Sequence, residues 1–329
     1  MYLEKLLVMN RYQAKIGELL PNKVRSVMQR GLGVIGKRFG TALGPFHKDV
    51  DEALRAYSLF NKEYPEAEEE LDADIIRRAI DFDYISWPRR IRKYVQGRDV
   101  LDVGCGTGVH SIGYVVVGVK SYTGVDPFIR LDKDRAKNLR TRQWEEGFGW
   151  TPREVMEQFK RVELIPGKFE DIDSARLFDV AVLHNVTEHL MRIDEVIEGI
   201  ASKLRPDGRI LFNHHNFYCW NGHHHLPKTI DQIDPNDPEQ KKYMDWGHIR
   251  FTPPEGHYFL RGLNKIKLDE LKDIVGRHYE IEVWNEIPSS EKNGRSRLTD
   301  DIAARFPELT RRDLAIHNVF CVAAKKKAS

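Results

Sequence analysis

Cysteine and long hydrophobic runs are both scarce in this chain of 329 residues. Its three cysteines, Cys105, Cys219 and Cys321, have neither the spacing of a disulfide framework nor that of a thiolate zinc site, which favours a reducing cytoplasm. No apolar run approaches the ~18 residues that span a bilayer. Glu4 and Lys5 interrupt the apolar start that a secretory signal would need. We therefore expect a cytoplasmic protein without a transmembrane segment.

A charge excess of one sign is also missing. Charged residues make up 31% of the chain, yet the net charge is only +2. This balance argues against a nucleic-acid binder that is driven by bulk charge. Two phosphate-binding motifs are absent as well. There is no G-x-x-x-x-G-K-[ST] loop, and Val109 stands where a dinucleotide fingerprint needs its third glycine.

The segment VLDVGCGTG, residues 100–108, is the most informative part of the sequence. A short apolar run ends near the acidic Asp102, and a turn with Gly104, Gly106 and Gly108 follows at once. In a parallel sheet this pattern brings a ligand to a backbone loop, where missing β-carbons leave room for a nucleoside. Residues 120–126 predict a second strand that ends in Asp126. About 20 residues after a glycine turn, a doubly wound sheet places an acid against ribose hydroxyls.

Further strands are predicted along the rest of the chain, at residues 162–165, 178–183, 209–212, 279–284 and 318–323, with Asp207-Gly208 as a turn and Thr151-Pro152 as a helix start. In their order, and over roughly residues 75–325, these elements resemble the class I S-adenosylmethionine-dependent methyltransferases. The resemblance implies an α/β fold, Rossmann-like and doubly wound, with a seven-stranded sheet whose last strand is antiparallel. The expected domains are a helical N-terminal extension (1–74) and a methyltransferase domain (75–329). Insertions are expected at about 130–160, 213–262 and 286–312, of which 213–262 would cover the active site.

S-adenosylmethionine is the cofactor that this resemblance implies. The residues expected to bind it are Asp102, Gly104, Cys105, Gly106, Gly108, Asp126, Phe169, Glu170 and His184. Asp126 would take the ribose hydroxyls, and residues 168–171 would border the adenine. Many relatives have an acid where Lys168 stands, so Phe169, Glu170 or backbone groups are expected to contact the base instead.

The expected catalytic residues are His184, His214, His215 and Tyr218. His184 directly follows the fourth strand and is the first choice for a general base, since an imidazole titrates near neutral pH. With Trp220 and the run His223–His225, they predict a polar aromatic cleft for a polyhydroxylated or phenolic acceptor. Neighbouring residues of an extended segment alternate, so at most two of the three adjacent histidines should act together.

A divalent metal is a second expectation, and it depends on Glu188-His189. This pair resembles half of an E-x-x-E-H segment of ubiquinone O-methyltransferases and small-RNA 3′-end methyltransferases, which binds a metal together with a later histidine. Asn185 replaces the first glutamate, and His248 is the candidate later ligand. The alternative is that Glu188 only stabilises a helix N-terminus.

The expected function is O-methylation of a small polar acceptor such as a sugar or glycan intermediate. The alternatives are an RNA 2′-O-methyltransferase and a non-catalytic, methyltransferase-like partner subunit. Nucleic acid is not the favoured partner, and a homo-oligomer stays open. Residues 1–48, which are basic, predict a helix packed on the core or on a second subunit. The alternatives are a helix on a membrane surface and an arm that docks on a partner.

Overall fold

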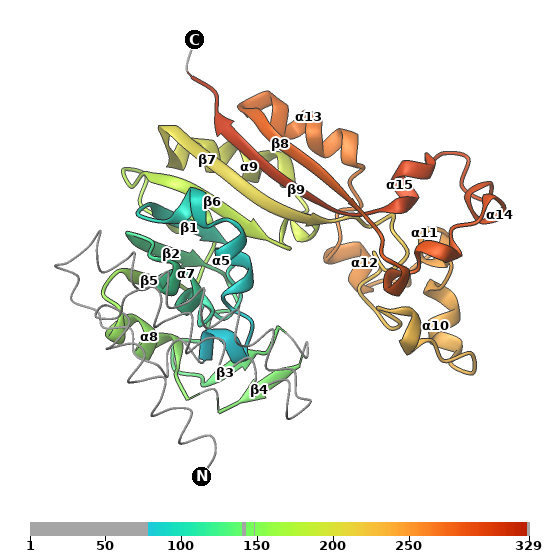
Figure 1. Ribbon diagram of the computed structural model, residues 1–329, viewed down its shortest axis with the longest axis horizontal. Helices are drawn as coiled ribbons and strands as arrows, with labels where there is room; N and C mark the ends of the chain where they lie inside the picture. Colours follow the sequence, from blue (N-terminus) through green and yellow to red (C-terminus); the bar gives the residue numbers. More distant parts are fainter. Residues whose placement is uncertain (1–77, 140–142, 148, 328–329) are drawn as a thin grey trace, which may run out of the picture. The chain divides into compact units, whose positions relative to one another are not determined.

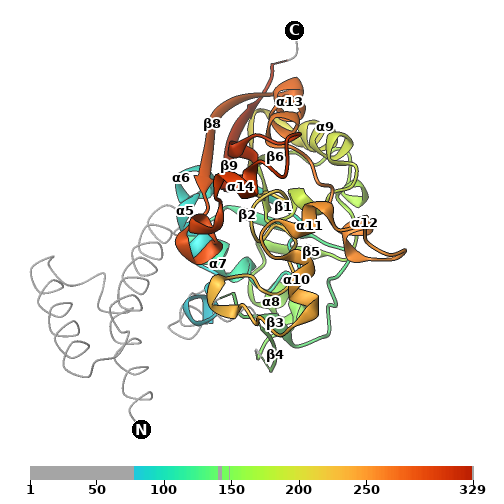
Figure 2. The ribbon, with the colours of Figure 1, turned by 90° about the vertical axis from the view of Figure 1, so that its right-hand side faces the viewer.

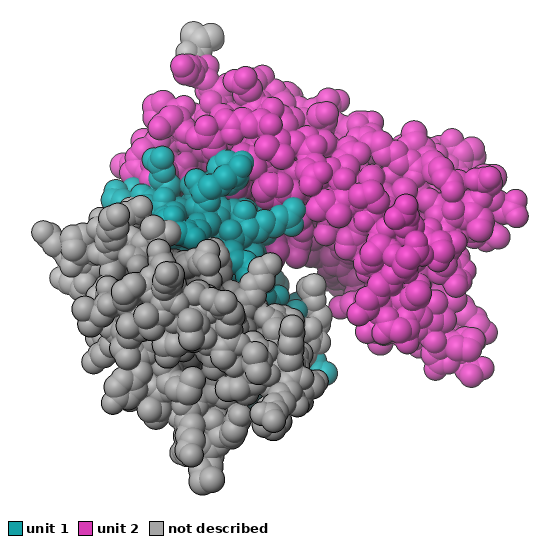
Figure 3. All heavy atoms as spheres, viewed as in Figure 1, with its two compact units in different colours: residues 1–171 teal, residues 172–329 magenta. Residues whose placement is uncertain are grey.

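The computed structural model describes residues 78–139, 143–147 and 149–327. The predicted extension 1–74, with its basic segment 1–48, lies outside these residues. The chain divides into two compact units, Met1–Asp171 and Ile172–Ser329 (Figure 3). The strands form a seven-stranded sheet in the order β5-β2-β1-β6-β7-β9-β8, which confirms the predicted Rossmann-like fold class. No helix among the described residues is both long and apolar enough to cross a membrane.

Three parallel strands carry the first unit: β1 (Asp99–Val103), β2 (Ser121–Val125) and β5 (Val162–Ile165). The apolar run 100–103 is buried in β1, as a strand covered on both faces should be. The helix α7 (Ser111–Val117) follows the glycine turn, and every one of its residues is buried. It ends at Gly118, whose φ of 81° closes the helix in the left-handed conformation. The short helices α5 (Ser86–Arg90) and α6 (Arg92–Val95) precede β1.

The predicted insertion at 130–160 contains a small antiparallel ribbon and a helix. The ribbon pairs β3 (Arg135–Lys137) with β4 (Trp144–Glu146). The helix α8 (Pro152–Gln158) begins as predicted: the Thr151 hydroxyl accepts from the Glu154 N–H, the Glu154 carboxylate accepts from the Thr151 N–H, and Pro152 occupies the first turn.

The second unit holds β6 (Phe178–His184), β7 (Leu204–His215), β8 (Tyr279–Pro288) and β9 (Ile316–Lys325). β7 runs parallel to β6, whereas β9 is antiparallel to both β7 and β8, which is the predicted antiparallel end of the sheet (Figure 1). The helices α9 (Ile193–Lys203) and α13 (Leu268–His278) pack against each other. The expected turn at Asp207-Gly208 lies within β7 instead, where pairing with β6 shifts register.

Short helices fill the two later segments that the sequence marks as insertions. The first contains η3 (Ile230–Gln232), α10 (Pro238–Tyr243), α11 (Gly247–Arg250) and α12 (Tyr258–Arg261). The second contains η4 (Glu291–Asn293), η5 (Arg295–Arg297), α14 (Asp300–Ala303) and, after it, α15 (Arg311–Ala315). Figure 1 shows the helices of these segments gathered beyond one end of β7 and β9, and Figure 2 views them from that side. They share a core of Trp220, Trp246, Ile302, Phe306 and Leu314, so the two insertions fold as one body.

Candidate active site

The glycine loop between β1 and α7 has a backbone that requires its glycines. Gly104, Gly106 and Gly108 have φ angles of 78°, 63° and 82°, in the left-handed region that side chains with a β-carbon disfavour. A β-carbon on Gly108 would also lie 2.7 Å from the Leu164 side chain. One on Gly106 would meet its nearest neighbour, His110, only at 3.8 Å, so space remains beside this residue. The loop is therefore shaped by its backbone and open at Gly106.

Asp126 closes this loop from the end of β2. One carboxylate oxygen accepts from the Gly106 N–H at 2.8 Å, and the other accepts from the Phe128 N–H at 2.7 Å. Burial raises the pKa of this carboxyl, while both backbone hydrogen bonds and nearby His110 oppose the rise. A carboxylate oxygen has lone pairs beyond one hydrogen bond, so Asp126 can still accept from ligand hydroxyls.

Asp102 is held from two sides within the first unit. The Tyr122 hydroxyl donates to it at 2.7 Å, and His110 Nε2 lies 3.7 Å from the same carboxylate oxygen. His110 is a candidate site residue that was not predicted from the sequence. Its position two residues after the last glycine of the loop was the available signal. His110 is partly exposed, so it can meet a ligand at the glycine loop as well as Asp102.

The segment 167–171 follows β5 and lies beside Asp126. The Gly167 N–H donates to the Asp126 carbonyl at 3.2 Å, and Phe169 is buried at the start of η1 (Phe169–Asp171). Glu170 is exposed. Cys105 is buried, and its sulfur lies against Gly124, which fits a small wall residue. The residues expected to hold the cofactor thus gather here, except His184, which belongs to the second unit.

His184 is the last residue of β6 and pairs with Asn213 of β7. The next residue, Asn185, has a φ of 57°, and its side-chain oxygen accepts from the Asn213 amide at 2.6 Å. The residue that replaces the first glutamate of the metal motif is therefore engaged in a link to β7. Strained backbone of this kind is common at functional sites.

A buried carboxylate and four histidines come together after β6 and at the end of β7. We call Glu188, His189, His214, His215 and His224 the carboxylate–histidine cluster. Glu188 lies in η2 (Thr187–His189), is 2% exposed, and accepts from the His215 backbone N–H. Its Oε1 has no hydrogen-bond partner and lies 3.9 Å from His189 Nε2. Burial raises the pKa of Glu188 to about 8.

His214 is linked to Glu188 through Thr187. The Thr187 hydroxyl lies 2.9 Å from His214 Nδ1 and 3.5 Å from Glu188 Oε2. A hydroxyl has one proton, so if it donates to the carboxylate, it accepts from Nδ1–H of His214. His214 Nε2 then carries the lone pair, and this buried atom has no hydrogen-bond partner. Burial lowers the pKa of His214 to about 3, so the imidazole is neutral at physiological pH.

The three adjacent histidines separate into two sets, as alternation requires. His223 and His225 both stack on the Tyr243 ring, with centroid distances of 5.3 and 5.0 Å. His224 faces the other way, and its Nε2 lies 2.8 Å from His215 Nδ1. A φ of 60° at His224 accompanies this reversal. Only His224 of the three therefore belongs to the cluster.

Three expected site residues have other surroundings. The Tyr218 hydroxyl donates to the Lys265 carbonyl at 2.8 Å, so it is committed to the backbone. Trp220 does not line a cleft, because it is 0% exposed in the insertion core. His248 is buried, and its two ring nitrogens face the carbonyls of Phe217 and Tyr243 at 2.8 and 3.3 Å.

The metal set Glu188, His189 and His248 is not brought together. Among the described residues, two groups of three or more potential ligands occur: Glu188, His215 and His224, and His215, Cys219 and His317. Neither group includes His189 or His248. Because both nitrogens of His248 meet carbonyl oxygens, its surroundings do not fit the ligand role that the resemblance implied.

Comparison with known proteins agrees with this geometry. A family model described as "Methyltransferase domain" matches residues 73–277, which is more than half of the chain. The chain therefore belongs to the methyltransferase domain family, and its domain is that of the class I S-adenosylmethionine-dependent methyltransferases. This confirms the predicted enzyme class and its methyl donor.

Curated relatives match over shorter stretches. The tRNA U34 carboxymethyltransferase of Photobacterium profundum is 30% identical over 118 residues, which are 36% of this chain and 32% of the relative. The mitochondrial ubiquinone biosynthesis O-methyltransferase of Bos taurus is 31% identical over 120 residues, which are 36% of this chain and 29% of the relative. The match spans about a third of each relative's length.

Solved structures give more distant likenesses. An S-adenosylmethionine-dependent methyltransferase from Mesorhizobium loti has a TM-score of 0.42 and 15% identity, covering 73% of this chain and 97% of that one. The 1,6-didemethyltoxoflavin-N1-methyltransferase of Burkholderia thailandensis has a TM-score of 0.40 and 13% identity, covering 94% of this chain and 91% of that one.

Proposed function

We propose that this protein transfers the methyl group of S-adenosylmethionine to a hydroxyl of a small polar acceptor, such as a sugar or glycan intermediate. The glycine loop and Asp126 bind the donor in the first unit. The carboxylate–histidine cluster of the second unit binds the acceptor hydroxyls. The observation that carries the proposal is the pair of buried, unpartnered polar atoms in that cluster, Glu188 Oε1 and His214 Nε2.

Two such atoms are costly to bury unless a ligand satisfies them. A hydroxyl is matched to both, because it donates one hydrogen bond and accepts others. Vicinal hydroxyls would engage the carboxylate and the imidazole together. This polar lining supports a polyhydroxylated acceptor.

His214 is the group we assign to the proton. Its Nε2 lone pair takes the acceptor's proton while the oxygen attacks the methyl carbon and the sulfonium leaves as a thioether. The hydrogen bonds through Thr187 to Glu188 orient the ring, which is the logic of a base held by a third group. His184, at the end of β6, stays the second candidate for this role.

RNA methylation is the second candidate function, because a tRNA-modifying enzyme is among the relatives. The net charge of +2 speaks against it, since RNA binding draws much of its affinity from basic surface. A non-catalytic partner subunit would need neither the loop nor the unpartnered base.

Acceptor classes can be compared directly with a radiolabelled methyl donor. We expect label to enter monosaccharides or nucleotide sugars, to be stable as an ether, and to be absent from RNA. Catechols serve as the phenolic comparison. Label in RNA alone would contradict the assignment, and so would no transfer to any hydroxyl by protein that binds S-adenosylmethionine.

A further inference from the structure

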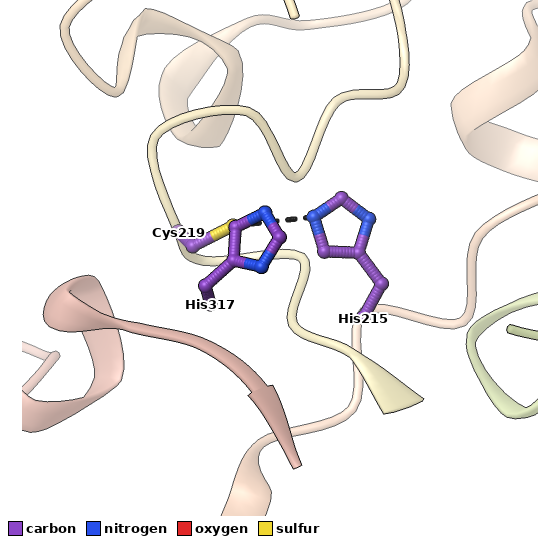
Figure 4. Close-up of side chains that lie close together, drawn as sticks. All are labelled: His215, Cys219 and His317. Atoms are coloured by element: carbon purple, nitrogen blue, oxygen red, sulfur yellow. Dashed lines mark hydrogen bonds between the residues drawn. The ribbon is translucent and has the colours of Figure 1, made fainter. Parts of the chain in front are cut away.

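We propose that His215, Cys219 and His317 form a zinc site, which shares only His215 with the carboxylate–histidine cluster. Figure 4 shows the three side chains converging in the second unit. One ligand atom of each lies within 4.8 Å of the others. The set has one sulfur and two imidazoles, the donors that Zn²⁺ takes in tetrahedral sites. This inference does not depend on the proposed function.

The spacing of the sulfur and the nearer imidazole fits a shared ion. His215 Nε2 lies 3.5 Å from Cys219 Sγ. With Zn–S of about 2.3 Å and Zn–N of about 2.0–2.1 Å, a tetrahedral ion separates a sulfur from a nitrogen ligand by about 3.6 Å. His317 lies beside them, with its ring centroid 4.7 Å from that of His215. A small side-chain rotation of His317 would complete three ligands.

The backbone around the site is fixed by Asn216. Its side-chain amide donates to the carbonyls of Asp313 and Ile316, each at 2.7 Å, and its N–H donates to the His317 carbonyl at 3.0 Å. The Cys219 N–H donates to the Asn216 carbonyl at 3.3 Å, and this turn brings the cysteine back toward β7. A buried asparagine thus joins the segments that carry all three ligands and holds their backbones in place.

The fourth position would face Asn221. Its Oδ1 lies 3.2 Å from Cys219 Sγ and 3.3 Å from His215 Nε2. Without metal this oxygen accepts from the thiol. When Zn²⁺ binds, the S–H bond breaks, the Zn–S bond forms, and the proton leaves to solvent. Three protein ligands then leave one position for water or for Asn221.

Metal binding would also fix the tautomer of His215. With Nε2 on the ion, the proton must sit on Nδ1, which then donates to His224 Nε2 at 2.8 Å. The other potential group, Glu188, His215 and His224, shares His215. A neutral imidazole has one lone pair, so a single ion can take this histidine at a time. The two arrangements are therefore distinguishable by substitution.

The test is metal titration of the full chain after chelator treatment. Co²⁺ should produce the thiolate-to-cobalt charge-transfer band and the intense visible bands of a tetrahedral site, and Zn²⁺ should displace it. Loss of an outer-sphere partner typically weakens a metal site 10–100-fold. Loss of a ligand in Cys219→Ser or His317→Asn should therefore weaken Zn²⁺ binding more than about 100-fold. Cys219→Ser should also abolish the thiolate band.

Cys321→Ala and Glu188→Gln are the matched controls, and both should keep the band and the affinity. The proposal is overturned if wild-type protein binds Co²⁺ without a thiolate band or binds no Zn²⁺. It is also overturned if Glu188→Gln loses the metal while His317→Asn keeps it, which would move the ion to the other group. The wild-type spectrum decides the matter even where a variant fails to fold.

Discussion

At the scale of single residues, the glycine loop is shaped by its own backbone, whereas His214 is positioned by the Thr187 side chain from a distant segment. Gly104, Gly106 and Gly108 could be predicted as loop residues from their close spacing. Their backbone is left-handed, a conformation that favours glycine. His214 could not be separated from its neighbour His215, because its role depends on Thr187 and Glu188, which β6 brings to the end of β7. Hydrogen bonds between segments far apart in the chain cannot be recognised from the spacing of residues in the sequence.

Asp126 gives the sharpest prediction for donor binding. Asp126→Ala should weaken the binding of S-adenosylmethionine by about 1.5–3 kcal/mol, which is the contribution of a charged hydrogen bond. The Kd should therefore rise roughly ten- to a hundredfold. Burial raises the pKa of this carboxyl above 3.8. Only the ionised carboxylate can accept hydrogen bonds from both ribose hydroxyls. Affinity in the wild type should therefore fall as pH falls through that raised pKa, at a higher pH than for an ordinary aspartate.

Calorimetry across a pH series measures both effects. Glu157→Gln is the control, because this carboxylate is exposed on α8, which contributes no residue to the expected donor site. Equal affinity in Asp126→Ala and wild type would remove Asp126 from the donor site, and so would a pH response that persists unchanged in the variant.

At the scale of elements, most strands were predictable, whereas the packing of the two later insertions on each other was not. β5 matches its expected bounds, 162–165, because an apolar run between polar segments defines a short buried strand. β7 was predicted too short, since an irregular pairing hides Asp207-Gly208 within it. The core that joins residues 213–262 with 286–312 could not be predicted from the sequence, because it depends on packing between segments far apart in the chain.

This shared core predicts a stability effect. Phe306 is 2% exposed and packs with Trp220 and Trp246. Phe306→Ala should lower the free energy of unfolding by about 3–5 kcal/mol, as a large cavity in a core does. Denaturant titration measures this free energy. Arg305→Ala is the control, because the exposed Arg305 should change the free energy of unfolding by close to zero. A loss below about 1 kcal/mol would mean that the two insertions do not stabilise each other.

At the scale of the whole molecule, the proposed donor residues lie in the first unit and the proposed acceptor residues lie in the second. The family match ends at residue 277, before β8, the second insertion and β9. β9 nonetheless pairs with β7 at the positions of His214 and His215, so sequence beyond the match helps to place the cluster. The sequence could reveal the donor class from one loop, whereas the acceptor depends on side chains that several segments contribute.

The central claim is tested most directly by measuring kcat and the Kd of S-adenosylmethionine side by side in His214→Asn and wild type. Asparagine can still donate to Thr187 but cannot take a proton. General base catalysis is worth about 10²–10⁴-fold, so we expect kcat to fall by that amount while Kd stays within about twofold. His225→Asn, which lies on the Tyr243 side of the same histidine-rich segment, should keep both values. Unchanged turnover in His214→Asn, or a parallel loss of donor affinity, would contradict the account.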